Sequence, residues 1–129
     1  MLAGKNVFLT GFAGTGKSTV LNEYRARSMS NYVVVAPTGI AALNVHGQTI
    51  NSFFMLPFGI LTPDNVEEIP YRRKKEIIKS VDTLIVDEIS MVRSDMFAAM
   101  DRRMREVASR KNKDKPFGGK QVIVCGDFF

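Results

Sequence analysis

Cysteine is nearly absent from this sequence, and long apolar runs are missing altogether. The single cysteine, Cys125, excludes an internal disulfide and is typical of a protein in a reducing cytosol. Because Cys125 lies within an apolar run, we predict a buried thiol rather than a nucleophile. No run approaches the roughly 18 apolar residues of a membrane span. Gly11 and Gly14 interrupt the run after Lys5 that a secretion signal would need. We therefore predict a cytoplasmic protein without a membrane partner.

Internal repeats and low-complexity segments are also missing. The 129 residues are enough for one domain with a substantial core. Hydrophobic residues make up 45% of the chain and charged residues 24%, as in ordinary soluble globular domains. The net charge of +5 is compatible with a polyanionic partner without requiring one.

Residues 11–18, GFAGTGKS, match the phosphate-loop pattern G-x-x-x-x-G-K-[ST]. The apolar run 6–10 predicts a strand before the loop, and residues 17–27 predict a helix after it. Lys17 would neutralise the β- and γ-phosphates of ATP, and the Ser18 hydroxyl would hold Mg²⁺. The alternative is a glycine-rich turn without a ligand, but a chance match at four positions is rare when glycine makes up about 7% of residues. The predicted nucleotide-binding residues are Gly11, Phe12, Ala13, Gly14, Thr15, Gly16, Lys17, Ser18 and Thr19.

Strands and helices are predicted to alternate along the rest of the chain. Continuous apolar runs at 32–36, 83–86 and 121–125 predict three more buried strands. Helices are predicted at 40–45, at 71–80, and from a capping Ser94 through the stripe Phe97, Met100, Met104, Val107 and Ala108. Residues 48–63 predict an irregular apolar loop. This order predicts an α/β fold with a mainly parallel sheet flanked by helices, and the four turns after its strands would share one edge.

Asp87 and Glu88 follow the apolar run 84–86, as the acids of a Walker B segment do. Asp87 would hold Mg²⁺ through its water shell, and Glu88 would polarise the water that attacks the γ-phosphate. The alternative is a solvated strand end, but the phosphate loop upstream favours the functional interpretation. A Ras-type GTPase usually has D-x-x-G here, whereas this chain has D-E-I-S. Hydrolysis coupled to motion is therefore the better interpretation.

Five ordered segments together resemble the superfamily one 5′-to-3′ DNA helicases of the petite-integration-frequency and RecD-like type. They are residues 11–18, 36–42 (APTGIAA), 47–54 (GQTINSFF), 87–92 (DEISMV) and 126–128 (GDF). The resemblance covers almost the whole chain. It implies a RecA-like phosphate-loop NTPase domain, ATP hydrolysis and single-stranded DNA as the track.

The resemblance also implies roles for residues at the matching positions. Lys17 and Glu88 would be catalytic, and Ser18 and Asp87 would bind the metal. The implied DNA contacts are Thr38, Gly39, Thr49, Asn51, Ser52 and Phe53. Gly126 and Asp127 would begin a third motif, which links the nucleotide state to the grip on DNA.

Three features depart from the family pattern. Asn51 stands where the family usually has histidine, although its amide can still hydrogen-bond a phosphate. Nothing before Met1 supplies the glutamine-bearing segment that reads adenine in relatives. The chain also ends at Phe129, where the family continues with Gln-Leu-Pro-Pro. From these ends we expect the N-terminal part of a motor domain, separated from a second RecA-like domain and its arginines.

Several features keep two interpretations open. The basic residues of 72–79 and of 102–111, which include Arg103, would be a solvated face or a DNA-facing surface. Phe53, Phe54 and Phe58 would stack on bases or pack in the core. His46 has no partner at ligand spacing, so we expect a loop residue.

The leading functional prediction is an ATP-dependent DNA helicase motor that uses ATP and Mg²⁺. One alternative is a module that binds nucleotide or DNA without catalysis. Another is a different phosphate-loop ATPase or small-molecule kinase. Stimulation of hydrolysis separates these classes, because DNA would stimulate a helicase and a small acceptor would stimulate a kinase.

Overall fold

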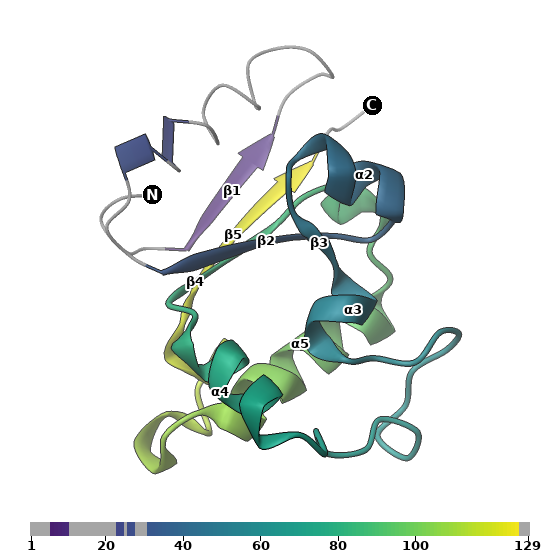
Figure 1. Ribbon diagram of the computed structural model, residues 1–129, viewed down its shortest axis with the longest axis vertical. Helices are drawn as coiled ribbons and strands as arrows, with labels where there is room; N and C mark the ends of the chain where they lie inside the picture. The colour runs from purple at the N-terminus through teal and green to yellow at the C-terminus, as the bar shows by residue number, and fades with distance from the viewer. Residues whose placement is uncertain (1–5, 11–22, 25, 28–30, 127–129) are drawn as a thin grey trace.

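The computed structural model describes residues 6–10, 23–24, 26–27 and 31–126 (Figure 1). The strands are β1 (Val7–Thr10), β2 (Tyr32–Ala36), β3 (Gln48–Thr49), β4 (Thr83–Val86) and β5 (Gln121–Gly126). The α-helices with described bounds are α2 (Gly39–Asn44), α3 (Ile50–Phe54), α4 (Arg72–Ser80) and α5 (Ser94–Val107). Short 3₁₀ helices are η1 (Ile89–Met91), η2 (Arg110–Asn112) and η3 (Pro116–Gly119). Residues 23–24 and 26–27 are helical, in agreement with the helix predicted at 17–27. The other residues of that predicted helix lie outside the described residues.

The five strands form one parallel sheet in the order β1-β5-β4-β2-β3. Their register places Thr10 beside Gly126 and Val86 beside both Val35 and Val124. The β2 sequence YVVVA forms a strand because every position after the first is buried, as a sheet covered on both faces requires. The predicted α/β fold is confirmed, and the four predicted strands are confirmed to within one residue.

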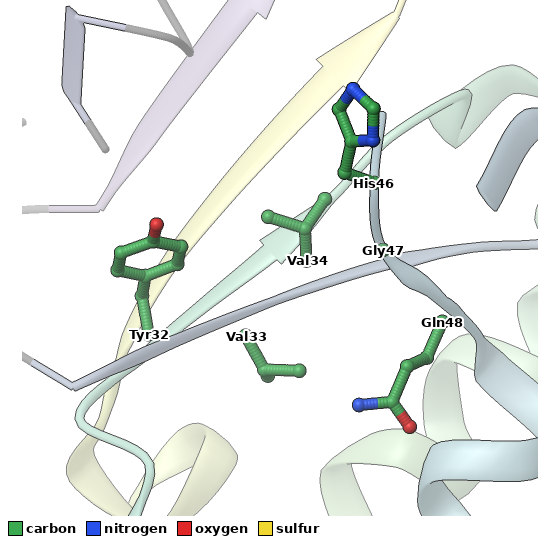
Figure 2. Close-up of a pocket in the computed structure, with 6 residues that line it drawn as sticks. All are labelled: Tyr32, Val33, Val34, His46, Gly47 and Gln48. Atoms are coloured by element: carbon green, nitrogen blue, oxygen red, sulfur yellow. The ribbon is translucent and has the colours of Figure 1, made fainter. Parts of the chain in front are cut away.

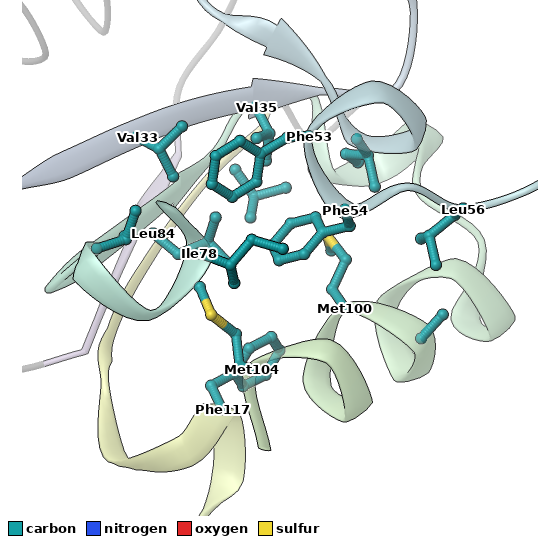
Figure 3. Packing of buried hydrophobic residues seen from close by; sticks show 14 of the residues in the cluster. Val33, Val35, Phe53, Phe54, Leu56, Ile78, Leu84, Met100, Met104 and Phe117 are labelled. Carbon is teal, nitrogen blue, oxygen red and sulfur yellow. The ribbon is translucent and has the colours of Figure 1, made fainter. Parts of the chain in front are cut away.

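Hydrophobic residues cover both faces of the sheet because neighbouring strand residues point in opposite directions. On one face, Val33 and Val35 of β2 join a large core to which α3, α4 and α5 contribute. Figure 3 shows the centre of this core, where Phe54, Ile78, Met100 and Met104 lie close together. On the other face the buried cluster is smaller and consists of Tyr24, Val34, Ile85, Ile123 and Cys125. The predicted buried thiol of Cys125 is therefore confirmed.

The prediction of an irregular loop over 48–63 is wrong for its first part. Residues Gln48–Thr49 pair with β2 as β3, and α3 begins immediately afterwards. The Thr49 hydroxyl caps this helix by accepting a hydrogen bond from the Ser52 amide at 3.2 Å. Capping and burial of the apolar face therefore stabilise a helix of only five residues, too short to show clear periodicity in the sequence.

The long helix α5 begins one residue earlier than a capping Ser94 would allow. Arg93 is the N-cap, because the Phe97 amide donates to the Arg93 carbonyl at 3.0 Å and Ser94 is already helical. The predicted apolar stripe is otherwise confirmed, since Met100, Met104 and Val107 are buried. Among the described residues, the helices are too short or too polar to cross a membrane.

Candidate functional site

The carboxyl ends of the four predicted strands meet at one edge of the sheet. Thr10, which directly precedes the phosphate-loop segment, ends β1 beside Gly126 at the end of β5. Asp87 follows β4, and its amide donates to the Val35 carbonyl in β2 at 2.9 Å. Because β2 continues into the turn before α2, the structure brings the approaches to all four predicted turns together. The phosphate-loop residues 11–18, Thr19 and Asp127 lie outside the described residues.

Asp87 and Glu88 occupy different environments although they are neighbours. The Asp87 side chain is buried, with 5% of its surface exposed, whereas Glu88 is half-buried. Glu88 has φ 54° and ψ 47°, a left-handed conformation that a residue with a Cβ adopts at some cost. This conformation lies at the point where the chain passes from β4 into η1. Sequence reasoning missed this strained backbone, because the Asp-Glu pattern carries no signal of it.

Gly126 lies against the segment that follows the two acids. A Cβ added at Gly126 would lie 2.6 Å from Ile89 Cγ2 and 3.6 Å from the Ile89 amide nitrogen. Such a separation is well inside van der Waals contact, so only glycine allows β5 and η1 to approach this closely. Gly126, which begins the predicted third motif, therefore lies directly against η1, which follows the two predicted Walker B acids.

Thr38 and Thr49 are both helix N-caps near this edge. The Thr38 hydroxyl oxygen accepts from the Ala41 amide at 3.2 Å, as Thr49 does from Ser52. Each hydroxyl keeps its own hydrogen for donation to another group. Within the described part of the chain, a Cβ added at the exposed Gly39 would meet nothing within 4 Å. The surface at the start of α2 is therefore open.

Two of the predicted DNA contacts are engaged in other roles. The Asn51 amide nitrogen donates to the Leu56 carbonyl at 3.3 Å and the Pro57 carbonyl at 3.1 Å. Both amide hydrogens are therefore used within the protein, and the remaining carbonyl oxygen is an acceptor that does not suit a phosphate. The Phe53 ring is 2% exposed and packs against Phe54 at 4.9 Å between ring centroids. The structure therefore supports the interpretation that Phe53 and Phe54 pack in the core, and it does not support base stacking by Phe53.

The structure also bears on the predictions made for Phe58, Arg103 and His46. Phe58 is 90% exposed, so it alone of the three phenylalanines keeps an open ring. Arg103 is 4% exposed, which contradicts both a solvated face and a DNA-facing surface at that position. His46 is an exposed residue between α2 and β3 with φ 53°, as a loop position allows. In the described ranges, no group of three or more His, Cys, Asp or Glu is arranged to hold a metal ion.

A cavity of about 410 Å³ lies beside β2 and the segment that leads into β3 (Figure 2). Its lining residues are Tyr32, Val33, Val34, His46, Gly47 and Gln48. Figure 2 shows His46 and Gln48 on either side of Gly47, whose added Cβ would lie 2.5 Å from the Val34 carbonyl oxygen. The cavity lies along β2 rather than at the edge that carries Asp87, so it is separate from the candidate site.

The family model described as "PIF1-like helicase" matches residues 1–129. The chain is 41% identical over 136 residues to the ATP-dependent DNA helicase Pif1 of Psychrobacter, covering 98% of this chain and 19% of that protein. It is 40% identical over 133 residues to the ATP-dependent DNA helicase PIF1 of Saccharomyces cerevisiae, covering 98% of this chain and 15% of that protein. The chain therefore spans less than a fifth of the length of these two relatives.

Solved structures of similar proteins share the fold. The Bacteroides Pif1 helicase in complex with ADP-AlF3 and single-stranded DNA has a TM-score of 0.86 and 46% identity, over 96% of this chain and 28% of that one. The Candida albicans Pif1 helicase has a TM-score of 0.78 and 34% identity, over 98% of this chain and 30% of that one.

Proposed function

The chain belongs to the PIF1-like helicase family, and on that premise we propose that residues 1–129 form the nucleotide-binding part of a RecA-like motor in an ATP-dependent helicase that moves on single-stranded DNA. The observation that carries this proposal is the single sheet edge where β1, β2, β4 and β5 end. The sequence segments that follow these strands are the phosphate loop, the Pro-Thr-Gly turn, the Asp-Glu pair and the Gly-Asp pair.

At this edge the proposed nucleotide roles follow from the chemistry of each side chain. Residues 11–19 bind the phosphates of ATP, and Lys17 neutralises charge on the β- and γ-phosphates. Ser18 and Asp87 hold Mg²⁺, which prefers hard oxygen ligands and retains several waters. Glu88 accepts a proton from the attacking water, and its half-buried position beside the buried Asp87 favours this division of roles.

The proposed DNA contacts lie at the starts of α2 and α3. Thr38 and Thr49 keep a hydroxyl hydrogen that can be donated to a phosphate oxygen, and Gly39 and Ser52 are exposed beside them. The similar Bacteroides Pif1 helicase, which was solved in complex with single-stranded DNA, supports a single-stranded track. Gly126 and Asp127 are proposed to transmit the nucleotide state to these contacts, through the close approach of Gly126 to Ile89.

Equilibrium binding of a fluorescent ATP analogue with Mg²⁺ tests the nucleotide site. We expect Lys17→Ala to weaken binding by about tenfold or more, because a unit positive charge next to the phosphates is lost. Lys111→Ala is the matched control, since it removes the same charge from an exposed position in η2. Equal affinity of wild type and Lys17→Ala would contradict the assignment of the loop.

Stimulation of hydrolysis tests the reaction class. Single-stranded DNA should increase phosphate release if the chain is part of a helicase motor. Stimulation by a small acceptor instead would indicate a kinase, and binding without turnover under any condition would indicate a binding module.

A further inference from the structure

Arg103 is a buried cation in the middle of the apolar face of α5. Its neighbours along that face include Met100, Met104 and Val107, and 4% of its surface is exposed. Transfer of a guanidinium out of water is costly unless its donors are hydrogen-bonded, and a hydrophobic residue of similar size often packs at lower cost. The position of Arg103 therefore requires an explanation in terms of what its donors hold.

Two of the Arg103 donors hold the carboxyl end of α3. Arg103 Nε donates to the Phe54 carbonyl at 2.8 Å, and an Arg103 terminal nitrogen donates to the Met55 carbonyl at 2.9 Å. The last carbonyls of a helix lack partners within the helix, and Met55 leaves α3 in a left-handed conformation with φ 53°. A charged donor from α5 thus caps a helix that has only five residues.

The third contact and the neighbouring Glu106 hold the far end of the following loop. The other Arg103 terminal nitrogen donates to the Glu67 carbonyl at 2.5 Å and to Glu106 Oε1 at 3.1 Å. Glu106 Oε2 accepts from the Ile69 amide at 2.9 Å. One arginine–glutamate pair on α5 therefore fastens both ends of the segment 55–69.

The Arg103 contacts at the carboxyl end of α3 also help to fix the position of its amino end. Thr49, the N-cap, belongs to β3, which pairs with β2 through only two residue pairs. The pairing alone leaves the direction of α3 weakly fixed, because two ladder positions allow the helix to pivot. Burial of Phe53 and Phe54 and the Arg103 bonds at the carboxyl end supply the second fixed point.

We propose that Arg103 is a positioning residue for DNA binding: by fixing the carboxyl end of α3 to α5, it holds Thr49 and Ser52 where they meet the DNA backbone. The inference rests on the proposed function, since it concerns the same DNA contacts. Arg103 itself is buried, so the proposed role acts through α3 and not through direct contact with DNA.

The test compares Arg103→Met with Arg103→Lys. Methionine keeps most of the length of the side chain and removes every donor, whereas lysine keeps the charge but cannot reach three carbonyls in a planar fork. Arg110→Met is the matched control, because it removes one positive charge from an exposed residue of η2. Three quantities are measured on the 129-residue chain: affinity for a fluorescent oligo-dT, affinity for a fluorescent ATP analogue with Mg²⁺, and amide hydrogen exchange.

We expect oligo-dT affinity to fall about tenfold in Arg103→Met and less in Arg103→Lys, with nucleotide affinity within about twofold of wild type. Exchange should accelerate at the Leu56 amide, which closes α3 by donating to the Asn51 carbonyl at 2.9 Å. Exchange in β4 and β5 should stay slow, which would show that the sheet is intact. Arg110→Met should leave local exchange and nucleotide affinity unchanged, and any loss of oligo-dT affinity should stay well below that of Arg103→Met.

Unchanged oligo-dT affinity in Arg103→Met, with faster exchange in α3, would overturn the positioning role. Unchanged amide hydrogen exchange in α3 would contradict the claim that Arg103 fixes the carboxyl end of this helix. If Arg103→Met loses protection in β4 and β5, Arg103→Lys decides by the same criteria. Wild type that binds ATP but not oligo-dT would contradict the proposed DNA contacts, and the inference would fall with them. If wild type binds oligo-dT and neither Arg103 variant weakens that binding, the positioning role is overturned while the proposed function stands.

Discussion

The contact between Gly126 and Ile89 allows a quantitative test of how β5 is joined to the Asp-Glu segment. In Gly126→Ala the new methyl group would lie 2.6 Å from Ile89 Cγ2, about 0.9–1.4 Å inside an ordinary carbon–carbon contact of about 3.5–4.0 Å. The next nearest atoms, the amide nitrogens of Ile89 and Ser90 at 3.6 Å and 3.7 Å, are at normal distances. The clash is therefore confined to one methyl group, and Ile89 must move to relieve it.

The magnitude follows from two opposing effects. Overpacking of a filled site typically costs about 1–3 kcal/mol. Replacement of glycine by alanine inside a regular element recovers about 0.5–1 kcal/mol, because the unfolded chain loses freedom. We therefore expect Gly126→Ala to lower the free energy of unfolding by about 1–2 kcal/mol. In an Ile89→Ala background Cγ2 is absent, so the same substitution should be neutral or slightly stabilising.

Urea unfolding followed by circular dichroism measures all four members of this double-mutant cycle. The expected coupling free energy between positions 89 and 126 is about 1–3 kcal/mol, in the range seen for residues in direct contact. Equal destabilisation by Gly126→Ala in both backgrounds would refute the reasoning, because the cost would then not arise from Ile89. Gly126→Ala should also slow phosphate release, since displacement of Ile89 shifts the neighbouring Glu88, the proposed general base.

Two further predictions concern single carboxylates. Glu88→Gln should bind ATP like wild type and lower hydrolysis about 10²–10⁴-fold, the usual contribution of a general base; phosphate release at the wild-type rate would remove Glu88 from this role. The hydrogen bond from Arg93, followed by that from the Leu61 amide, lowers the pKa of Asp95 from 3.8 to about 2. The stabilisation is thus present above about pH 4 and is lost as the pH falls towards 2. The urea midpoint of Asp95→Asn should therefore lie below that of wild type at pH 7 and approach it at pH 2, whereas an equal deficit at both values would contradict the assignment.

Short, continuous apolar runs and helical spacing made most of the fold predictable. Four strands follow from these runs because the sheet is buried on both faces, and the apolar stripe of α5 follows from helical spacing. The helix predicted at 71–80 agrees with α4 to within one residue. The meeting of the turns after the strands at one edge then follows from parallel topology alone, without knowledge of strand order. This is why Asp87 and Gly126 could be placed at one edge of the sheet from the sequence.

Short elements that depend on tertiary partners could not be predicted. β3 has two residues and α3 has five, so neither is long enough to repeat its hydrophobic period of two or 3.6 residues. Their stability comes from pairing with β2, from the Thr49 cap and from burial of Phe53 and Phe54. The segment therefore looked like a loop, and its phenylalanines looked available to DNA, because the partners that bury them come from distant parts of the sequence.

Arg103 shows the same limit in its strongest form. Its neighbours Arg102 and Arg105 are also basic, so composition alone placed all three on a charged face of α5. Helical spacing gave the opposite indication, since Arg103 follows Met100 by three residues and precedes Val107 by four, which puts it on the buried face. A cation at such a position is compatible with folding only if hydrogen-bond acceptors surround it. Here those acceptors include the carbonyls of Phe54, Met55 and Glu67. Backbone carbonyls leave no trace in a sequence pattern. A basic residue on the apolar face of a helix is therefore a candidate for hydrogen bonding to the carbonyls of irregular backbone. A substitution that removes its donors and keeps its length tests this.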